Sequence, residues 1–253
     1  MVSSPAPPLV PVVPVSTSLQ TPLRGTPRCA LRNNIYKRII VRGRDVLEGI
    51  RFARDVVSFS SGVVTLWKAA TGGKAVGCLP AIPVPEVLHA AGLLPIALES
   101  PEDLPLLSGQ IDAWLVGADS SPFPAPSSSL PRFSFPQAPA ASVEEALDRV
   151  EALAEWACAV SGDPASEGAL WKSIRAYATR RSLLDALNDR CAREPAFLNP
   201  EEHRNIVHAG SFLPPEAHSR LLSTILGIES EPAASRAEGE KGDPLIILAK
   251  RLM

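Results

Sequence analysis

The stretch from Gly72 to Leu98, GGKAVGCLPAIPVPEVLHAAGLLPIAL, constrains the fold more than any other part of the chain. After the two glycines, residues 74–79 are almost entirely apolar and predict a short buried strand. Prolines at positions 80, 83 and 85 exclude a regular ladder or helix directly after this strand. The chain must therefore turn within a few residues of Leu79.

The same stretch then predicts a helix and a second extended segment. Pro85 suits the first turn of a helix, and Glu86 places a carboxylate at the positive end of its dipole. An apolar stripe follows at helical spacing (Val87, Leu88, Ala91 and Leu94), and Gly92 and Pro95 close it before residues 95–98 become extended. A strand–helix–strand crossover of this kind builds a parallel sheet, so we expect a Rossmann-like α/β fold with ligand sites in the loops after the strands.

The rest of the chain divides by composition. Residues 1–43 form a Pro-rich leader that we expect to be disordered, and 44–141 form the α/β domain. Residues 142–228 predict a helical segment, and 229–253 a charged linker with the opening strand of another α/β unit at 244–252.

Several elements can be placed within these parts. We expect a helix over 45–70, broken near Ser60–Gly62, a polar turn from Glu99 to Gln110, and strands over 111–116 and 130–135. Ser142 with Glu145 three residues later predicts a capping box for a helix that ends at Gly162. Further helices are expected over 166–193, 200–209 and 214–228.

Composition excludes some classes of partner. A net charge of −2 gives no general attraction to nucleic acid, and no uninterrupted apolar run is long enough to cross a bilayer. Four cysteines at positions 29, 78, 158 and 191 have no CxxC spacing, and the chain has no convincing secretion signal. We therefore expect a soluble protein in a reducing compartment, the cytoplasm.

A few side chains are candidates for catalysis or ligand binding, and each of them also has a purely structural explanation. Glu86 faces the turn after the first strand as a binding or proton-transfer group, or it only complements the helix dipole. Asp119 ends a strand where ligand-facing residues gather, or it forms a turn. Cys78 is a candidate metal ligand or a small buried side chain. His203 and His208 are five residues apart and do not predict a zinc pair.

Two segments in the same order resemble a known family. The segments PEVLHAAGLLPIAL, after a glycine-containing strand, and IDAWLVGADS at 111–120 resemble the N-terminal signature of the 2-hydroxyacyl-CoA dehydratase and benzoyl-CoA reductase subunits. That signature has a Pro-Glu dipeptide, then Ala-Ala-Gly and a proline, and later an aspartate-led strand ending in Thr-Cys-Asp. The resemblance covers roughly residues 72–228. It implies that a second α/β domain follows the helical segment, and nearly all of that domain is missing from this sequence.

The resemblance also implies a chemistry. The family acts on acyl-CoA thioesters by one-electron chemistry with a 4Fe-4S cluster, a homologous partner subunit and an ATP-dependent activator. By this resemblance Glu86 would orient the thioester or shuttle protons, and Asp119 and Ser120 would bind the substrate. The family's cluster cysteines, however, correspond to Ala81 and Ala118 here, which leaves Cys78 as the nearest substitute ligand.

Two hypotheses follow for the function. The chain is a catalytic-complex subunit that forms part of an acyl-CoA pocket beside a partner that holds the cluster. Alternatively, it is a truncated, cluster-free relative that acts as a structural or interaction partner. Both hypotheses expect the turn before Glu86 and the strand end at Asp119 to share one cavity.

Overall fold

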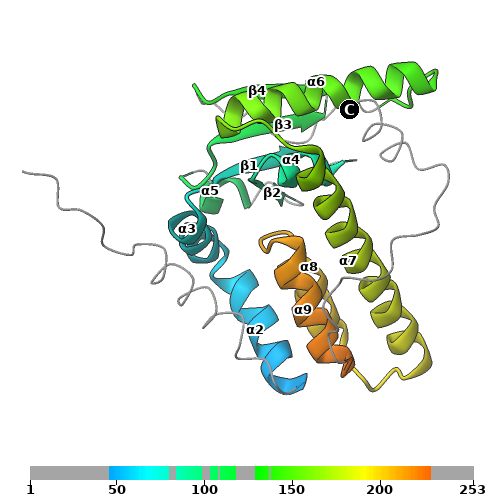
Figure 1. The fold of residues 1–253 in the computed structure, drawn as a ribbon. Coiled ribbons are helices and arrows are strands. Elements are labelled where there is room, and N and C mark those ends of the chain that lie inside the picture. Colours follow the sequence, from blue (N-terminus) through cyan, green and yellow to red (C-terminus); the bar gives the residue numbers. More distant parts are fainter. Residues whose placement is uncertain are drawn as a thin grey trace, which may run out of the picture.

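The structure is a computed structural model that describes residues 46–79, 84–98, 103–107, 109–117, 129–136 and 138–228. Four parallel strands form one sheet: β1 (Lys74–Leu79), β2 (Leu93–Ala97), β3 (Ala113–Gly117) and β4 (Arg132–Phe135). Their order is β2-β1-β3-β4, and every neighbouring pair is parallel (Figure 1). The predicted α/β fold with a parallel sheet is confirmed.

Helices before, between and after the strands complete the described fold. They are α2 (Val46–Ser58), α3 (Ser60–Thr71), α4 (Pro85–Ala90), α5 (Asp103–Leu107), α6 (Val143–Ser161), α7 (Glu167–Arg193), α8 (Pro200–Ala209) and α9 (Pro215–Leu226). The prediction for α6 is confirmed, since the Ser142 hydroxyl accepts the Glu145 backbone N–H at 3.1 Å and Gly162 ends the helix at φ 90°. The Glu145 carboxylate accepts from the N–H of Ala141 instead of Ser142, so the capping box is shifted by one residue.

Three predicted elements differ in detail. The long first helix is broken at Phe59, just before the predicted Ser60–Gly62. Leu94 lies in β2 and not on the helix, because Gly92 at φ 76° ends α4 early enough for the strand to begin at Leu93. The predicted polar turn contains α5, whose Leu107 is buried against the core and so holds this one-turn helix in place.

Alternate residues of the strands point to opposite faces of the sheet. On one face, side chains of all three longer strands pack with α3, α5 and the helical segment (Ala75, Leu79, Leu94, Ile96, Trp114 and Val116). On the other face, the alternate residues pack with α4, α6 and α7 (Val76, Cys78, Leu93, Ala113 and Leu115). Pro95 is tolerated because β2 is an edge strand. Both faces of the three longer strands are buried, as expected for a parallel sheet, whereas β4 at the edge is largely exposed.

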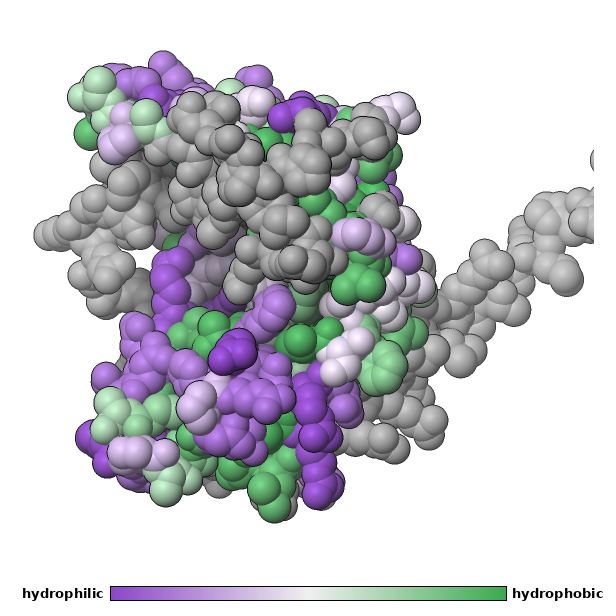
Figure 2. Space-filling view, turned by 180° about the vertical axis from the view of Figure 1, so that it is seen from behind, coloured by the Kyte–Doolittle hydropathy of each residue, from purple (hydrophilic) through white to green (hydrophobic). Residues whose placement is uncertain are grey.

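Helices α2, α8 and α9, with most of α7, form a second part of the molecule below the sheet (Figure 1). The long helix α7 packs along α9 and reaches α4, and α2 packs against α8 and α9 although it precedes the first strand. Seen from behind, this lower part is largely hydrophilic with smaller hydrophobic areas between (Figure 2). Within the described ranges, no helix combines the length and hydropathy needed to cross a membrane.

The strand order creates a switch point between β1 and β3. The connection from β1 runs through α4 to β2 on one side, whereas the connection through α5 returns past β1 to β3 on the other. In open α/β sheets a crevice forms where the strand order reverses, outside the carboxyl ends of the two strands. Leu79 and Gly117 are the last residues of these strands, and both lie at this edge.

Candidate functional site

Glu86 is a buried carboxylate at the start of α4, the helix that follows β1. It is the second residue of α4, and its side chain is only 2% exposed. The Arg181 guanidinium of α7 donates from Nη1 to its Oε1 over 2.5 Å. The Arg181 side chain itself is 54% exposed, so solvent reaches one member of the ion pair and not the other. A carboxylate that is buried away from water requires an ion-pair partner, and Arg181 of α7 is that partner.

A chain of hydrogen bonds links α4 to α7 and α9. The Ser173 hydroxyl donates to the backbone oxygen of Glu86 over 2.7 Å. Its single hydrogen is then used, so it accepts from Nδ1–H of His89, 3.0 Å away. Nε2 of His89 lies 3.4 Å from the carboxylate of Glu216 on α9. Burial alone would raise the pKa of Glu216, but the hydrogen bond and charge of His89, with lesser contributions from its own backbone N–H and Lys172, lower it overall.

Tyr177 and Arg180 lie on α7 next to these hydrogen-bonded residues. Burial raises the pKa of the Tyr177 phenol far above its ordinary value, so the ring stays neutral. It meets the His89 ring edge-on with centroids 5.8 Å apart, and the Arg180 guanidinium lies 5.7 Å from its centroid. Burial also lowers the pKa of Arg180, which neighbouring Glu86 partly offsets.

His218 of α9 is a fully buried imidazole near Arg180. Its Nε2–H donates to the backbone oxygen of Ile206 over 2.9 Å, and Nδ1 has no hydrogen-bond partner among the described residues. Burial, with the nearby charge of Arg180, lowers its pKa to about 4. A Cβ at Gly210 would lie 2.5 Å from this ring and 2.8 Å from the Arg180 guanidinium. Only glycine leaves room for both side chains at this position.

The cysteine predicted as a substitute cluster ligand lies in the core. Cys78 is in β1, is fully buried, and its Sγ is 3.3 Å from the backbone oxygen of Val76. Burial raises the pKa of the thiol well above its ordinary value, which opposes the thiolate that iron requires. Across the described ranges, no three His, Cys, Asp or Glu side chains are grouped closely enough to hold a metal ion. The surroundings of Cys78 therefore do not fit a 4Fe-4S ligand.

The other predicted site residues lie outside the described residues: Asp119, Ser120 and the two cluster positions, Ala81 and Ala118. The strand that precedes them, β3, is parallel to β1, so it ends at the same edge of the sheet from which the chain enters α4. The expectation that Glu86 and Asp119 share one cavity stays a prediction.

Sequence reasoning missed the residues that surround Glu86. Ser173, Tyr177, Arg180 and Arg181 belong to a helix that was predicted correctly but was interpreted only by its apolar face. Successive members of this set are four, three and one residues apart. At this spacing their side chains lie on or beside the apolar stripe of α7 that contains Ile174. A polar group recurring within an apolar stripe signals a buried partner.

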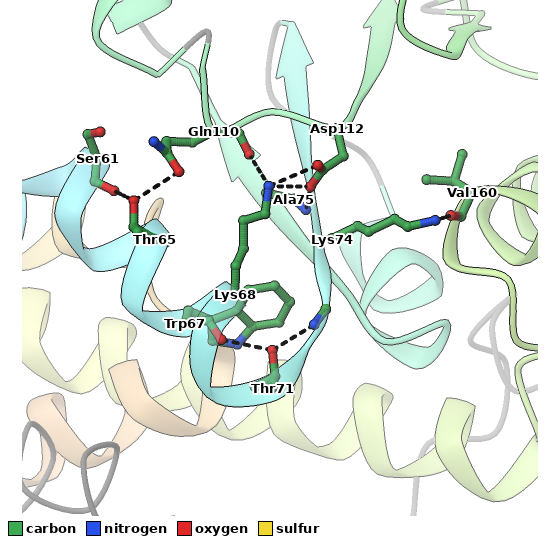
Figure 3. A network of polar contacts seen from close by, with 11 residues as sticks. Ser61, Thr65, Trp67, Lys68, Thr71, Lys74, Ala75, Gln110, Asp112 and Val160 are labelled. Carbon is green, nitrogen blue, oxygen red and sulfur yellow. Dashed lines mark hydrogen bonds and ion pairs between the residues drawn. The ribbon is translucent and has the colours of Figure 1, made fainter. Parts of the chain in front are cut away.

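The opposite edge of the sheet is fixed by polar contacts (Figure 3). Asp112, just before β3, accepts the Ala75 N–H at 2.8 Å and forms an ion pair of 2.8 Å with Lys68 of α3. The Lys68 ammonium also donates to the backbone oxygen of Gln110 at 3.0 Å. Lys74 reaches the backbone oxygen of Val160 in the last turn of α6 at 2.5 Å. These contacts tie α3 and α6 to the starts of β1 and β3.

The fold and this site define a doubly wound α/β protein whose sheet is joined to a helical segment through a buried Glu–Arg ion pair. No protein-family model matches the sequence, and no curated protein does.

Proposed function

We propose that this chain is a subunit-like member of the 2-hydroxyacyl-CoA dehydratase and benzoyl-CoA reductase family. In this proposal it binds an acyl-CoA thioester at the carboxyl edge of the sheet, beside a homologous subunit that carries the 4Fe-4S cluster. The observation that supports it best is Glu86, a carboxylate 2% exposed and fixed by Arg181 at the start of α4, the helix that the chain enters from the carboxyl end of β1. A fixed carboxylate after a strand of a parallel sheet is suited to orient a ligand or to move a proton.

The proposal assigns separate roles to the two subunits. The one-electron step belongs to the partner subunit and its ATP-dependent activator, because Cys78 is unsuited to hold iron. The role of this chain is to position the thioester. Ser173 and Arg181 keep α4, and with it Glu86, in a fixed orientation at the edge of the sheet.

A second candidate function is that of a cluster-free structural or interaction partner. The burial of Cys78 and the alanines at positions 81 and 118 favour it, since they remove every thiolate that the family resemblance would place at the cluster. In this case Glu86 and Arg181 serve only to join the two parts of the fold.

Calorimetric titration with acyl-CoA thioesters tests the first candidate. Benzoyl-CoA and a 2-hydroxyacyl-CoA are titrated into the full chain, with free coenzyme A and the free acids as controls. We expect thioester binding that Glu86→Gln weakens by about tenfold, the loss of one charged hydrogen bond. Glu155→Gln on α6 is the matched control, because this glutamate is exposed and forms no hydrogen bond or ion pair with other described residues. Absence of thioester binding, alone and with the partner subunit, would favour the second candidate.

Anaerobic reconstitution with iron and sulfide tests where the cluster resides. We expect the isolated chain to show no visible charge-transfer absorbance and no bound iron. A cluster on the wild-type chain that Cys78→Ser abolishes would show that this thiol leaves the core to bind iron. A cluster that survives this substitution would be held by other residues. Either result would contradict the assignment of the cluster to the partner subunit alone.

A further inference from the structure

A groove opens at the amino edge of the sheet, at the other end of α4 from Glu86. Its volume is about 630 Å³, within the range of small-molecule sites. The walls come from the end of α3, the starts of β1 and β2, the turn after α6, and the facing sides of α7 and α9. His89 lines this groove, whereas Glu86 does not. The groove is therefore distinct from the carboxyl edge.

Two cations on its rim are available to a ligand. Lys172 of α7 and Arg220 of α9 line the groove from separate helices, and both are exposed. Lys172 forms no hydrogen bond or ion pair with the described residues, and Arg220 uses only its Nε, which donates to the backbone oxygen of Glu216 at 3.2 Å. The ammonium of Lys172 and the outer nitrogens of Arg220 are thus free to bind an anion.

The remaining charges in the groove are largely occupied. The Lys74 ammonium donates to the carbonyl of Val160, and the carboxylate of Glu216 is engaged by His89. Asp163 is the other acidic side chain that lines the groove. On the side formed by α7 and α9 the groove therefore has two cations, Lys172 and Arg220, and one carboxylate, Glu216, which interacts with His89 and Lys172.

One wall of the groove is apolar. Trp67, Leu94 and Ala217 line it, belong to one core cluster, and are at least nine-tenths buried. The Trp67 ring packs directly on Gly73, where a Cβ would lie 2.3 Å from the ring. Glycine at this position lets the indole lie against the chain, which leaves an apolar wall without a side chain projecting from Gly73.

We propose that this groove binds a small organic anion. Its carboxylate or phosphate group would bind Lys172 and Arg220, and its apolar body would lie against the wall formed by Trp67 and Ala217. The site is independent of the proposed acyl-CoA function. It lies at the opposite edge of the sheet, and Arg181, the ion-pair partner of Glu86, is not among its lining residues. Failure of one proposal leaves the other standing.

Isothermal titration of the full chain with four probes tests the site. Phenyl phosphate and phenylacetate carry both features, inorganic phosphate carries only the anion, and benzyl alcohol carries only the ring. We expect the two organic anions to bind saturably and the other two to bind at least about tenfold more weakly, because each lacks one of the two sets of contacts. Lys172→Glu and Arg220→Glu should each weaken phenyl phosphate binding by about tenfold or more.

The control is Arg175→Glu on the same helix. Arg175 is exposed, does not line the groove, and contacts no described residue through a hydrogen bond or ion pair. Its charge reversal should leave binding unchanged. Lys172→Met and Arg220→Met repeat the test with variants that keep the aliphatic stems, and thermal unfolding verifies that each variant is folded.

Three results would overturn the proposal. One is the absence of saturable binding of either organic anion by the folded wild type. Another is equal weakening by Arg175→Glu, which would indicate only the general charge of α7. The last is equal affinity for inorganic phosphate and phenyl phosphate, which would show that the apolar wall is not used.

Discussion

Replacing Arg181 by methionine is the most direct test of how the sheet is joined to the helical segment. The substitution keeps much of the aliphatic stem but removes the guanidinium that donates to Glu86 at 2.5 Å. Glu86 is 2% exposed, and its carboxylate receives no other hydrogen bond from a side chain of the described residues. Its carboxylate would then be buried without its ion-pair partner, a state that costs more than the pair itself contributes.

The magnitude follows from the unequal exposure of the two side chains. Removing one partner of a fully buried ion pair costs about 3–5 kcal/mol. The Arg181 side chain is 54% exposed, so water can reach the space that it vacates and solvate part of the carboxylate. We therefore expect the free energy of unfolding to fall by about 2 kcal/mol, below the fully buried case. For a domain of this size that corresponds to a decrease in Tm of about 4–8 °C.

Urea unfolding followed by circular dichroism measures the loss, and a double-mutant cycle assigns it. Glu86→Gln removes the charge that needs the partner, so Arg181→Met should cost far less in the Glu86→Gln background than in the wild type. Arg175→Met on the exposed side of α7 serves as control. Equal costs in both backgrounds would refute the reasoning.

Three further predictions concern the core around the site. Gly77→Ala places a Cβ 2.5 Å from the buried Trp114 ring, and should lower the free energy of unfolding by about 1–3 kcal/mol. Trp114→Leu in the Gly77→Ala background should restore part of this loss. If the losses of the two single variants simply add in the double variant, the steric explanation is wrong. The folded-state pKa of His218 is about 4 against 6.5 for a free imidazole, so the unfolded state takes up its proton first. Stability should therefore fall by about 3 kcal/mol between pH 6.5 and 4, and His218→Gln should flatten this dependence in chemical unfolding; an unchanged slope would contradict the buried neutral ring. Finally, iodoacetamide at pH 8 should modify the half-buried Cys158 before Cys78 in the folded protein, as read by peptide mass spectrometry, because burial protects the Cys78 thiol; equal rates would show that β1 opens.

Local signals were sufficient to predict most elements of the fold. The apolar run before three prolines predicts β1 over the residues that form it, and the cap at Ser142 and glycine at 162 predict α6. The errors lie where tertiary contacts decide the conformation. The helix α5 is five residues long and is held by burial of Leu107, which a polar sequence context conceals. The start of β2 at Leu93 depends on pairing with Lys74, a contact between residues distant in sequence.

The candidate site was only partly predictable for a related reason. The position of Glu86 at a helix start after a strand follows from local rules, and the structure places it there. Its partner Arg181 is 95 residues away on α7, and no local rule connects the two. For Cys78 the sequence allowed either a substitute cluster ligand, implied by the family resemblance, or a small buried side chain. The structure shows the second, because the period of the strand directs the side chain into the core shared with α4 and α6.

The short helix α4 explains why so much polar chemistry gathers around it. A helix of six residues is not stable by itself, so tertiary contacts must hold it against the sheet. Apolar contacts of Val87 and Leu88 fix its inner side, and Ser173 bonds both the Glu86 carbonyl and the His89 ring. One hydroxyl on α7 thus connects the residue at the carboxyl edge with the residue that lines the groove at the amino edge. Because the two edges share this support, the buried Glu–Arg pair and the groove are best understood as two ends of one structural unit.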